Sequence, residues 1–234
     1  MAGLAGEAVF TARGILRGAL RLGPIAIFII PFGIAYGAAA IEAGMTAAQA
    51  IGTSALVFAG ASQFAVLDLW DESMALATVV LVVLAVNARH VLLGAALARW
   101  LNGIPPVQRY IAATWISDAN FADTQKAFEQ GERDVAILLG GGLVMWVAWV
   151  AGTAFGAMGS ANFVDPSRWG VDVLMPAFFA AVVAPGVTGS VVMGAAAVVA
   201  AVVAVASLPY LPAGWSVILA ALAGGLVGAF ARAR

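Results

Sequence analysis

The stretch that decides the fold is FAGASQFAVLDLW, residues 58–70, because it places a small polar cluster inside an apolar run. Gly60, Ser62 and Gln63 follow one another with only Ala61 between them. Glycine weakens a helix, and the glutamine amide both donates and accepts hydrogen bonds. What such a cluster does therefore depends on the solvent that surrounds it.

The composition is that of an integral membrane protein. Of the 234 residues, 63% are hydrophobic and 10% are charged, and the mean hydropathy is +1.02. Soluble domains carry about 25% charged residues, so this chain has too few polar side chains to cover a soluble surface. Apolar runs about 20 residues long match the hydrocarbon layer of a bilayer, and the alternating pattern of barrel strands is absent. The sequence therefore predicts an all-α, polytopic bundle in a lipid bilayer, with broken or re-entrant helices.

The apolar runs define one membrane domain. We expect a cytoplasmic amphipathic lead-in over residues 1–21, retained in the mature protein, and a single transmembrane domain over residues 22–234. A piece at residues 110–122 is too short to span. Small residues four apart predict close helix packing at Gly33/Gly37, Gly152/Gly156 and Gly224/Gly228. The predicted segments are 22–41, 46–67, 74–101, 135–158, 171–184, 189–208 and 214–230.

Basic residues set the expected orientation. Three arginines lie within the first 21 residues and two within the last three, so both termini are predicted to be cytoplasmic. The loop between Arg99 and Arg109 would lie outside if every earlier run crossed once, and inside if residues 46–67 formed a re-entrant hairpin. We prefer the hairpin because it leaves fewer basic residues outside, and we leave the number of full spans open.

Prolines interrupt two of the predicted segments, at Pro31 in FIIPFGIAYG and at Pro176 in DVLMPAFFA. Each removes a backbone donor and frees a carbonyl, which in lipid needs a neighbour, water or a ligand. A packing kink explains either proline alone, whereas the two together favour a binding site between discontinuous helices. If the chain also unwinds near Gly60, N–H groups at the next helix start could hold a carboxylate, and freed carbonyls could hold an ammonium. The alternative is an ordinary helix in which Ser62 and Gln63 bond to a neighbouring helix.

The sequence NARH, residues 87–90, lies at the centre of the run 74–101. Ionisable side chains at that depth cost about 2.5–3.5 kcal/mol. A single regular helix cannot point the side chains of Asn87, Arg89 and His90 toward one cavity. Either protein therefore surrounds the helix, or the helix breaks here. Asn87 and Arg89 are candidate substrate ligands, and His90 is a candidate proton relay. A structural ion pair for Arg89 and a packing role for His90 remain open.

Residues 114–124, TWISDANFADT, contain one carboxylate with apolar residues on both sides, Asp118. We expect it to pair with Arg89 or to act in coupling, and a position at the headgroup level remains the alternative. The candidate proton-coupling or ion-pair residues are thus His90 and Asp118. The candidate substrate-binding residues are Pro31, Gly60, Ala61, Ser62, Gln63, Asn87 and Arg89.

Several classes of protein are excluded by residues that the sequence lacks. There is no cysteine and one histidine, so thiolate and multi-histidine metal sites are excluded. The only lysine is Lys126, no P-loop is present, and neither the H-E-x-x-H nor the G-x-S-x-G pattern occurs. We expect no enzyme activity, no cofactor and no nucleic-acid partner.

Four motifs occur in a recognisable order along the chain. PFGIAYG (31–37) is followed by FAGASQF (58–64), NARHVLLGA (87–95) and SDANFA (117–122). On these motifs the chain resembles the AzlC family, the large subunit of branched-chain amino-acid exporters, over nearly its whole length. The resemblance has two departures, because Ala119 stands at an acidic position of the family and Leu93 at a position that is often aromatic.

The resemblance implies a secondary active transporter in the bacterial inner membrane. It implies export of the neutral amino acids leucine, isoleucine and valine, with methionine as a further candidate, together with a small AzlD-like membrane partner. The residues alone leave two other classes open. One is a channel or pore for small solutes, in which the polar groups form a filter, and the other is a scaffold subunit that transports nothing.

Overall fold

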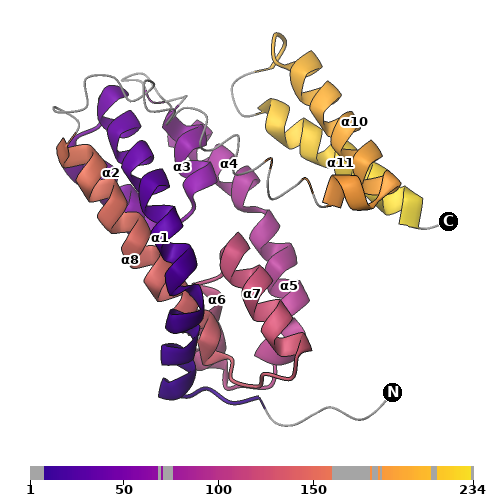
Figure 1. Cartoon of the computed structure of the whole chain (residues 1–234). Coiled ribbons are helices and arrows are strands. Elements are labelled where there is room, and N and C mark those ends of the chain that lie inside the picture. Colours follow the sequence, from indigo (N-terminus) through magenta and orange to yellow (C-terminus); the bar gives the residue numbers. More distant parts are fainter. Residues whose placement is uncertain are drawn as a thin grey trace.

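The structure is a computed structural model that describes residues 8–67, 70, 76–159, 180, 184, 186–211 and 215–232. Within these residues the secondary structure is helical, apart from a single bridge between Val9 and Asp134, so the predicted all-α membrane bundle is confirmed. The predicted segment 171–184, with Pro176, lies almost wholly outside the described residues. The helices of Figure 1 are α1 (Ala12–Glu42), α2 (Ala47–Val57), α3 (Gly60–Leu67), α4 (Leu76–Asn87), α5 (Arg89–Leu101), α6 (Pro106–Ala113), α7 (Asp118–Glu129), α8 (Ala136–Gly159), α10 (Val191–Ser207) and α11 (Trp215–Arg232).

Among the described residues, three helical stretches are long and apolar enough to cross a membrane: Ala12–Glu42, Val79–Leu101 and Ala136–Gly159. The second stretch joins α4 to α5. The shorter α10 and the adjacent α11 lie in the predicted segments 189–208 and 214–230, and they pack against each other. Since α1 begins at Ala12, the expected boundary at residue 21 falls inside a continuous helix.

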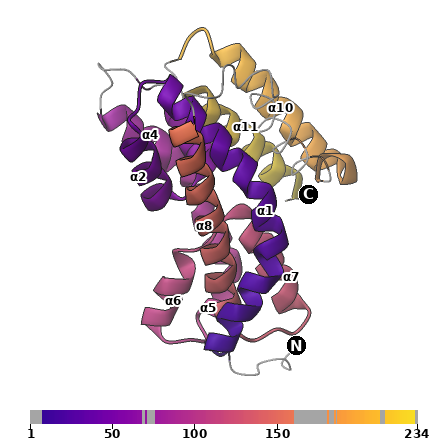
Figure 2. The same cartoon turned by 60° about the vertical axis from the view of Figure 1, so that its left-hand side comes forward.

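Glycines allow α1 and α8 to pack backbone against backbone (Figure 2). A methyl group on Gly33 or Gly37 would lie 2.7 Å from the Trp149 carbonyl oxygen or 2.2 Å from that of Thr153. Methyl groups on Gly152 and Gly156 would lie equally close to carbonyl oxygens of α1. The close packing that the small residues predict is therefore present in this helix pair.

Helices α2 and α3 form a re-entrant hairpin. Met45 and Leu67, at its two ends, belong to the same buried cluster as Ala40 near the end of α1. Its tip, Phe58, packs in addition against a second cluster, which contains Leu22 and Ala26 nearer the middle of α1. Phe58 has a φ of 43°, in the left-handed region, which ends α2 and reverses the chain. The chain thus enters and leaves at one end, as preferred from the arginine distribution.

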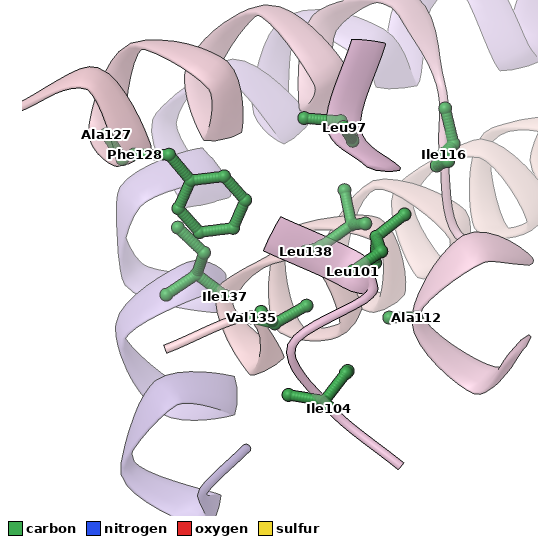
Figure 3. Close-up of a cluster of buried hydrophobic side chains, with 10 residues drawn as sticks. All are labelled: Leu97, Leu101, Ile104, Ala112, Ile116, Ala127, Phe128, Val135, Ile137 and Leu138. Atoms are coloured by element: carbon green, nitrogen blue, oxygen red, sulfur yellow. The ribbon is translucent and has the colours of Figure 1, made fainter. Parts of the chain in front are cut away.

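Helices α6 and α7 form a second hairpin, which enters from the opposite end (Figure 1). Before it, Gly103 lies against Ala8, which precedes α1. In the last turn of α7, Phe128 packs in the same cluster as Ile104 (Figure 3). The tip between the two helices is residues 114–117. The piece that looked too short to span, residues 110–122, therefore contains the tip of this hairpin with the end of α6 and the start of α7.

Ion pairs join α1 to the second hairpin at the end where α1 begins. Arg21 makes two hydrogen bonds to the Asp123 carboxylate, at 2.8 and 2.9 Å. Arg17 contacts Glu132 at 2.7 Å and Asp134 at 3.1 Å. This end therefore brings basic residues of α1 together with acidic residues of α7 and of the segment that follows α7.

Candidate functional site

Three helix breaks meet in the middle of the molecule. The first separates α2 from α3, the second is the turn at Ala88 between α4 and α5, and the third separates α6 from α7. The tips of the two hairpins touch, because the rings of Phe58 and Trp115 are 6.2 Å apart. Of the two alternatives left open for the NARH segment, a break is present as a single-residue turn at Ala88, and the residues of the segment lie beside both tips.

A cavity of about 120 Å³, here called the central cavity, opens between the breaks. Five residues predicted for the site line it, namely Gly60, Ala61, Arg89, His90 and Asp118. The remaining lining residues come mainly from the two long helices and the hairpin tips: Ile29, Phe32, Phe58, Ala59, Ser117, Met145 and Trp149.

The charged part of the central cavity is an ion pair between α5 and α7. The Arg89 Nη2 atom lies 3.0 Å from Asp118 Oδ2, and the two side chains are 33% and 42% exposed. The Arg89–Asp118 contact named from the sequence is thus present. Arg89 Nε and Ser117 Oγ are buried without a hydrogen-bond partner, so the pair leaves polar atoms to which a ligand could bind.

Helix starts add to the positive potential of the central cavity. Gly60, Arg89 and Asp118 are the first residues of α3, α5 and α7, and all three line it. The first N–H groups of a helix lack intrahelical partners and carry a partial positive charge. The cavity therefore offers a guanidinium and helix N-termini to an anionic group, with one carboxylate beside them.

Gln63 lies behind the wall of the central cavity. It is 4% exposed; its Nε2 donates to Ser54 Oγ at 3.0 Å, and its Oε1 accepts from Trp149 Nε1 at 2.9 Å. Ser54 Oγ in turn lies 2.8 Å from Thr153 Oγ1. The amide thus anchors the first hairpin to α8, and the structure places it outside the cavity that its sequence neighbours line.

A second cavity, of about 230 Å³, lies on the other side of the breaks, and Asn87 and His90 are among its lining residues. Asn87 Nδ2 donates to Ser62 Oγ at 3.2 Å, and Ser62, fully buried, donates to the Ala59 carbonyl at 2.8 Å. His90 Nδ1 lies 3.0 Å from the Asn87 carbonyl oxygen. Ser62 therefore supports the tip of the first hairpin, whereas His90 lines both cavities.

Pro31 lines neither described cavity, and α1 continues through it without a break. Its side chain is exposed on the outer surface of the bundle. The residue after it, Phe32, does line the central cavity. Sequence reasoning missed this phenylalanine, together with Met145 and Trp149, because such residues look the same as lipid-facing or packing residues in an apolar run.

Comparisons with known proteins identify the family. A family model described as AzlC protein matches residues 24–162. An uncharacterized membrane protein of Archaeoglobus fulgidus is 32% identical over 206 residues, which are 87% of this chain and 89% of that protein. The inner membrane protein YgaZ of Escherichia coli is 29% identical over 147 residues, 61% of this chain and 59% of its own length. No solved structure was found to match. The chain therefore belongs to the AzlC family of membrane proteins, as its motifs predicted.

Proposed function

We propose that this protein is a secondary active transporter that exports neutral branched-chain amino acids, without enzymatic chemistry or a cofactor. The observation that carries the proposal is the Arg89–Asp118 ion pair, which lies in an apolar-walled cavity between the tips of two re-entrant hairpins. Many secondary transporters bind substrate between discontinuous helices near the bilayer midplane. Membership of the AzlC family supports the same reading.

The charges in the central cavity match the two ends of an amino acid. Arg89 and the start of α3 suit the carboxylate, because a guanidinium and backbone N–H groups both donate to it. Asp118 suits the ammonium. A zwitterion that replaces the direct Arg89–Asp118 contact leaves neither charge unpaired within the membrane, where an unpaired charge is costly.

The rest of the wall suits an apolar side chain. Ile29, Phe32, Met145 and Trp149 line the central cavity from α1 and α8. Besides Arg89, Asp118 and His90, the described lining residues include no titratable group that could compensate a charged substrate side chain. These contacts support leucine, isoleucine, valine and methionine over acidic or basic amino acids.

The two hairpins support alternating access. One enters from each end of the α1–α8 pair, so each separates the central cavity from one side of the membrane (Figure 1). The end that carries Arg17 and Arg21 is the more basic, and we assign it to the cytoplasm. We place the protein in the bacterial inner membrane with a small AzlD-like subunit as its partner, as the family resemblance implies.

Flux measurements test the proposal directly. The full chain is reconstituted in liposomes with and without the AzlD-like subunit, and labelled leucine flux is followed at set pH gradients. Saturable, gradient-driven flux supports a transporter. Flux that rises linearly with concentration indicates a channel, and absence of flux even with the partner indicates a non-transporting subunit.

Charge removal tests the ion pair. Arg89→Gln and Asp118→Asn each leave one charge without its partner, so we expect both to lose leucine flux and to unfold at lower temperature. The double variant restores the charge balance and hence stability, but it keeps no charge for the zwitterion and should not transport. Arg99→Gln, on the same helix but stacked over Trp100, is the matched control with normal flux. Normal flux in the double variant would show that the pair is structural only.

A further inference from the structure

At each of the three helix breaks, the end of one helix and the start of the next line different cavities. The central cavity is lined by the first residues of α3, α5 and α7, whereas the second cavity is lined by the last residues of the helices before them. These are Val57 of α2, Asn87 of α4 and Ala113 of α6. The two cavities share Phe58, Ala59 and His90, so they lie next to each other.

Helix ends have the opposite polarity to helix starts. The last carbonyl groups of a helix lack intrahelical N–H partners, and the C-terminus carries a partial negative charge. Within a bilayer those carbonyls must be satisfied by protein, water or a ligand. Protein groups already contact several of these carbonyls, since the His90 ring nitrogen lies 3.0 Å from the Asn87 carbonyl oxygen and the Ile116 N–H donates to the Ala113 carbonyl. The partial negative charge of the three helix ends remains, and it favours a cation in the second cavity.

Asn87 supplies an independent observation. The single hydroxyl proton of Ser62 is used in its bond to the Ala59 carbonyl, so Ser62 Oγ can only accept from Asn87. This orients the amide with Nδ2 toward Ser62 and leaves Oδ1 as an acceptor. Asn87 Oδ1 is buried and has no hydrogen-bond partner. An unpaired buried acceptor is costly unless a donor or a cation binds there.

The lining also indicates the charge of the ligand. Within the part of the chain that the structure describes, the lining of the second cavity contains no Asp or Glu, and His90 is its one titratable group. Divalent cations such as Ca²⁺ are held in proteins with the help of carboxylates, whereas neutral oxygens and helix dipoles are sufficient for a single positive charge.

We propose that the second cavity binds a monovalent cation through Asn87 Oδ1 and the carbonyl ends of α2, α4 and α6. The chemistry fits a free ion such as Na⁺, and a substrate α-ammonium held here rather than at Asp118 is the second source that the test distinguishes. Cation binding itself does not depend on the proposed transport function, but its link to leucine does.

Binding to the purified full chain separates the two sources. Thermal unfolding is measured in NaCl against choline chloride at equal ionic strength, and then with leucine, 3-methylbutylamine or 4-methylpentanoate. The last two compounds carry only the amine or only the carboxylate of leucine. Stabilisation by Na⁺ without substrate indicates a free ion, and stabilisation by the amine but not by Na⁺ indicates the ammonium.

The variant that tests the ligand is Asn87→Leu, with Asn102→Leu in the exposed turn after α5 as the matched control. We expect Asn87→Leu to weaken Na⁺ or amine binding about 10- to 100-fold and to leave 4-methylpentanoate binding unchanged. Asn87→Asp places a carboxylate at the same point and should tighten cation binding, which provides a test if Asn87→Leu does not fold.

Two results would overturn the proposal: equal cation binding in Asn87→Leu and Asn102→Leu, or no tightening in Asn87→Asp. The outcome is separable from that of the transport proposal. Asn87-dependent cation binding without leucine flux retains the cation site and removes the transporter. Leucine flux together with cation binding that does not depend on Asn87 retains the transporter and removes the cation site.

Discussion

The contact between α1 and α8 makes a sharp prediction at Gly37. In Gly37→Ala the new methyl carbon would lie 2.2 Å from the Thr153 carbonyl oxygen and 2.7 Å from the Ala157 nitrogen. Both atoms are backbone, so neither can turn aside as a flexible side chain would. Ordinary contacts at such a carbon begin near 3.4 Å, so the two helices must separate locally by about an ångström.

The expected magnitude follows from this overlap. Overpacking of this kind costs about 1–3 kcal/mol. Separation would also disturb Thr153, whose hydroxyl lies 2.8 Å from Ser54 of the first hairpin. We therefore expect the free energy of unfolding to fall by an amount in the upper part of that range. Leucine flux should fall as well, because the tip of the first hairpin shifts.

Thermal unfolding of the purified protein, followed by tryptophan fluorescence, measures the effect. Gly94→Ala in α5 is the control, since a methyl group there meets no atom within 4 Å and no proline directly follows it. Alanine supports a helix better than glycine does, so the control should gain about 0.5–1 kcal/mol. Equal unfolding temperatures for the two variants would refute the close backbone approach.

Two further substitutions test other parts of the structure. Gln63→Ala leaves the Ser54 hydroxyl and the Trp149 N–H without their buried partner, which should cost about 1–3 kcal/mol in thermal unfolding, whereas Gln125→Ala on the exposed face of α7 should cost little. Normal stability of Gln63→Ala would argue against the anchoring role. Arg21→Gln removes a solvent-exposed ion pair and should cost only about 0.2–1 kcal/mol, with the difference from the unmodified chain shrinking at high salt.

The position of Gln63 shows where sequence reasoning ends. The residue type indicates a buried amide with donors and an acceptor, but it does not say which groups the amide meets. Ser54 lies nine residues earlier and Trp149 lies on α8, so the partners depend on how the hairpin folds back on the long helices. Gly60 and Ala61, its near neighbours, line the cavity while Gln63 points away from it.

The Arg89–Asp118 pair was predictable for a different reason. Within the central apolar runs few charges are available, and an arginine at that depth needs a carboxylate or a cavity. Asp118 is the one carboxylate in its stretch with apolar neighbours on both sides. Because so few carboxylates were available, Asp118 could be predicted as the partner of Arg89 without knowledge of how the helices pack.

The amino-acid sequence by itself determined that the protein lies in a membrane, that it is helical, and that residues 46–67 favour a hairpin. These properties follow from hydropathy, length and charge, which are local quantities. Only the tertiary structure decided that residues 106–129 form the opposing hairpin and that helix starts and helix ends line separate cavities. That arrangement depends on which distant segments pack together. The identity of an apolar residue in a membrane helix does not indicate which other helix it will contact.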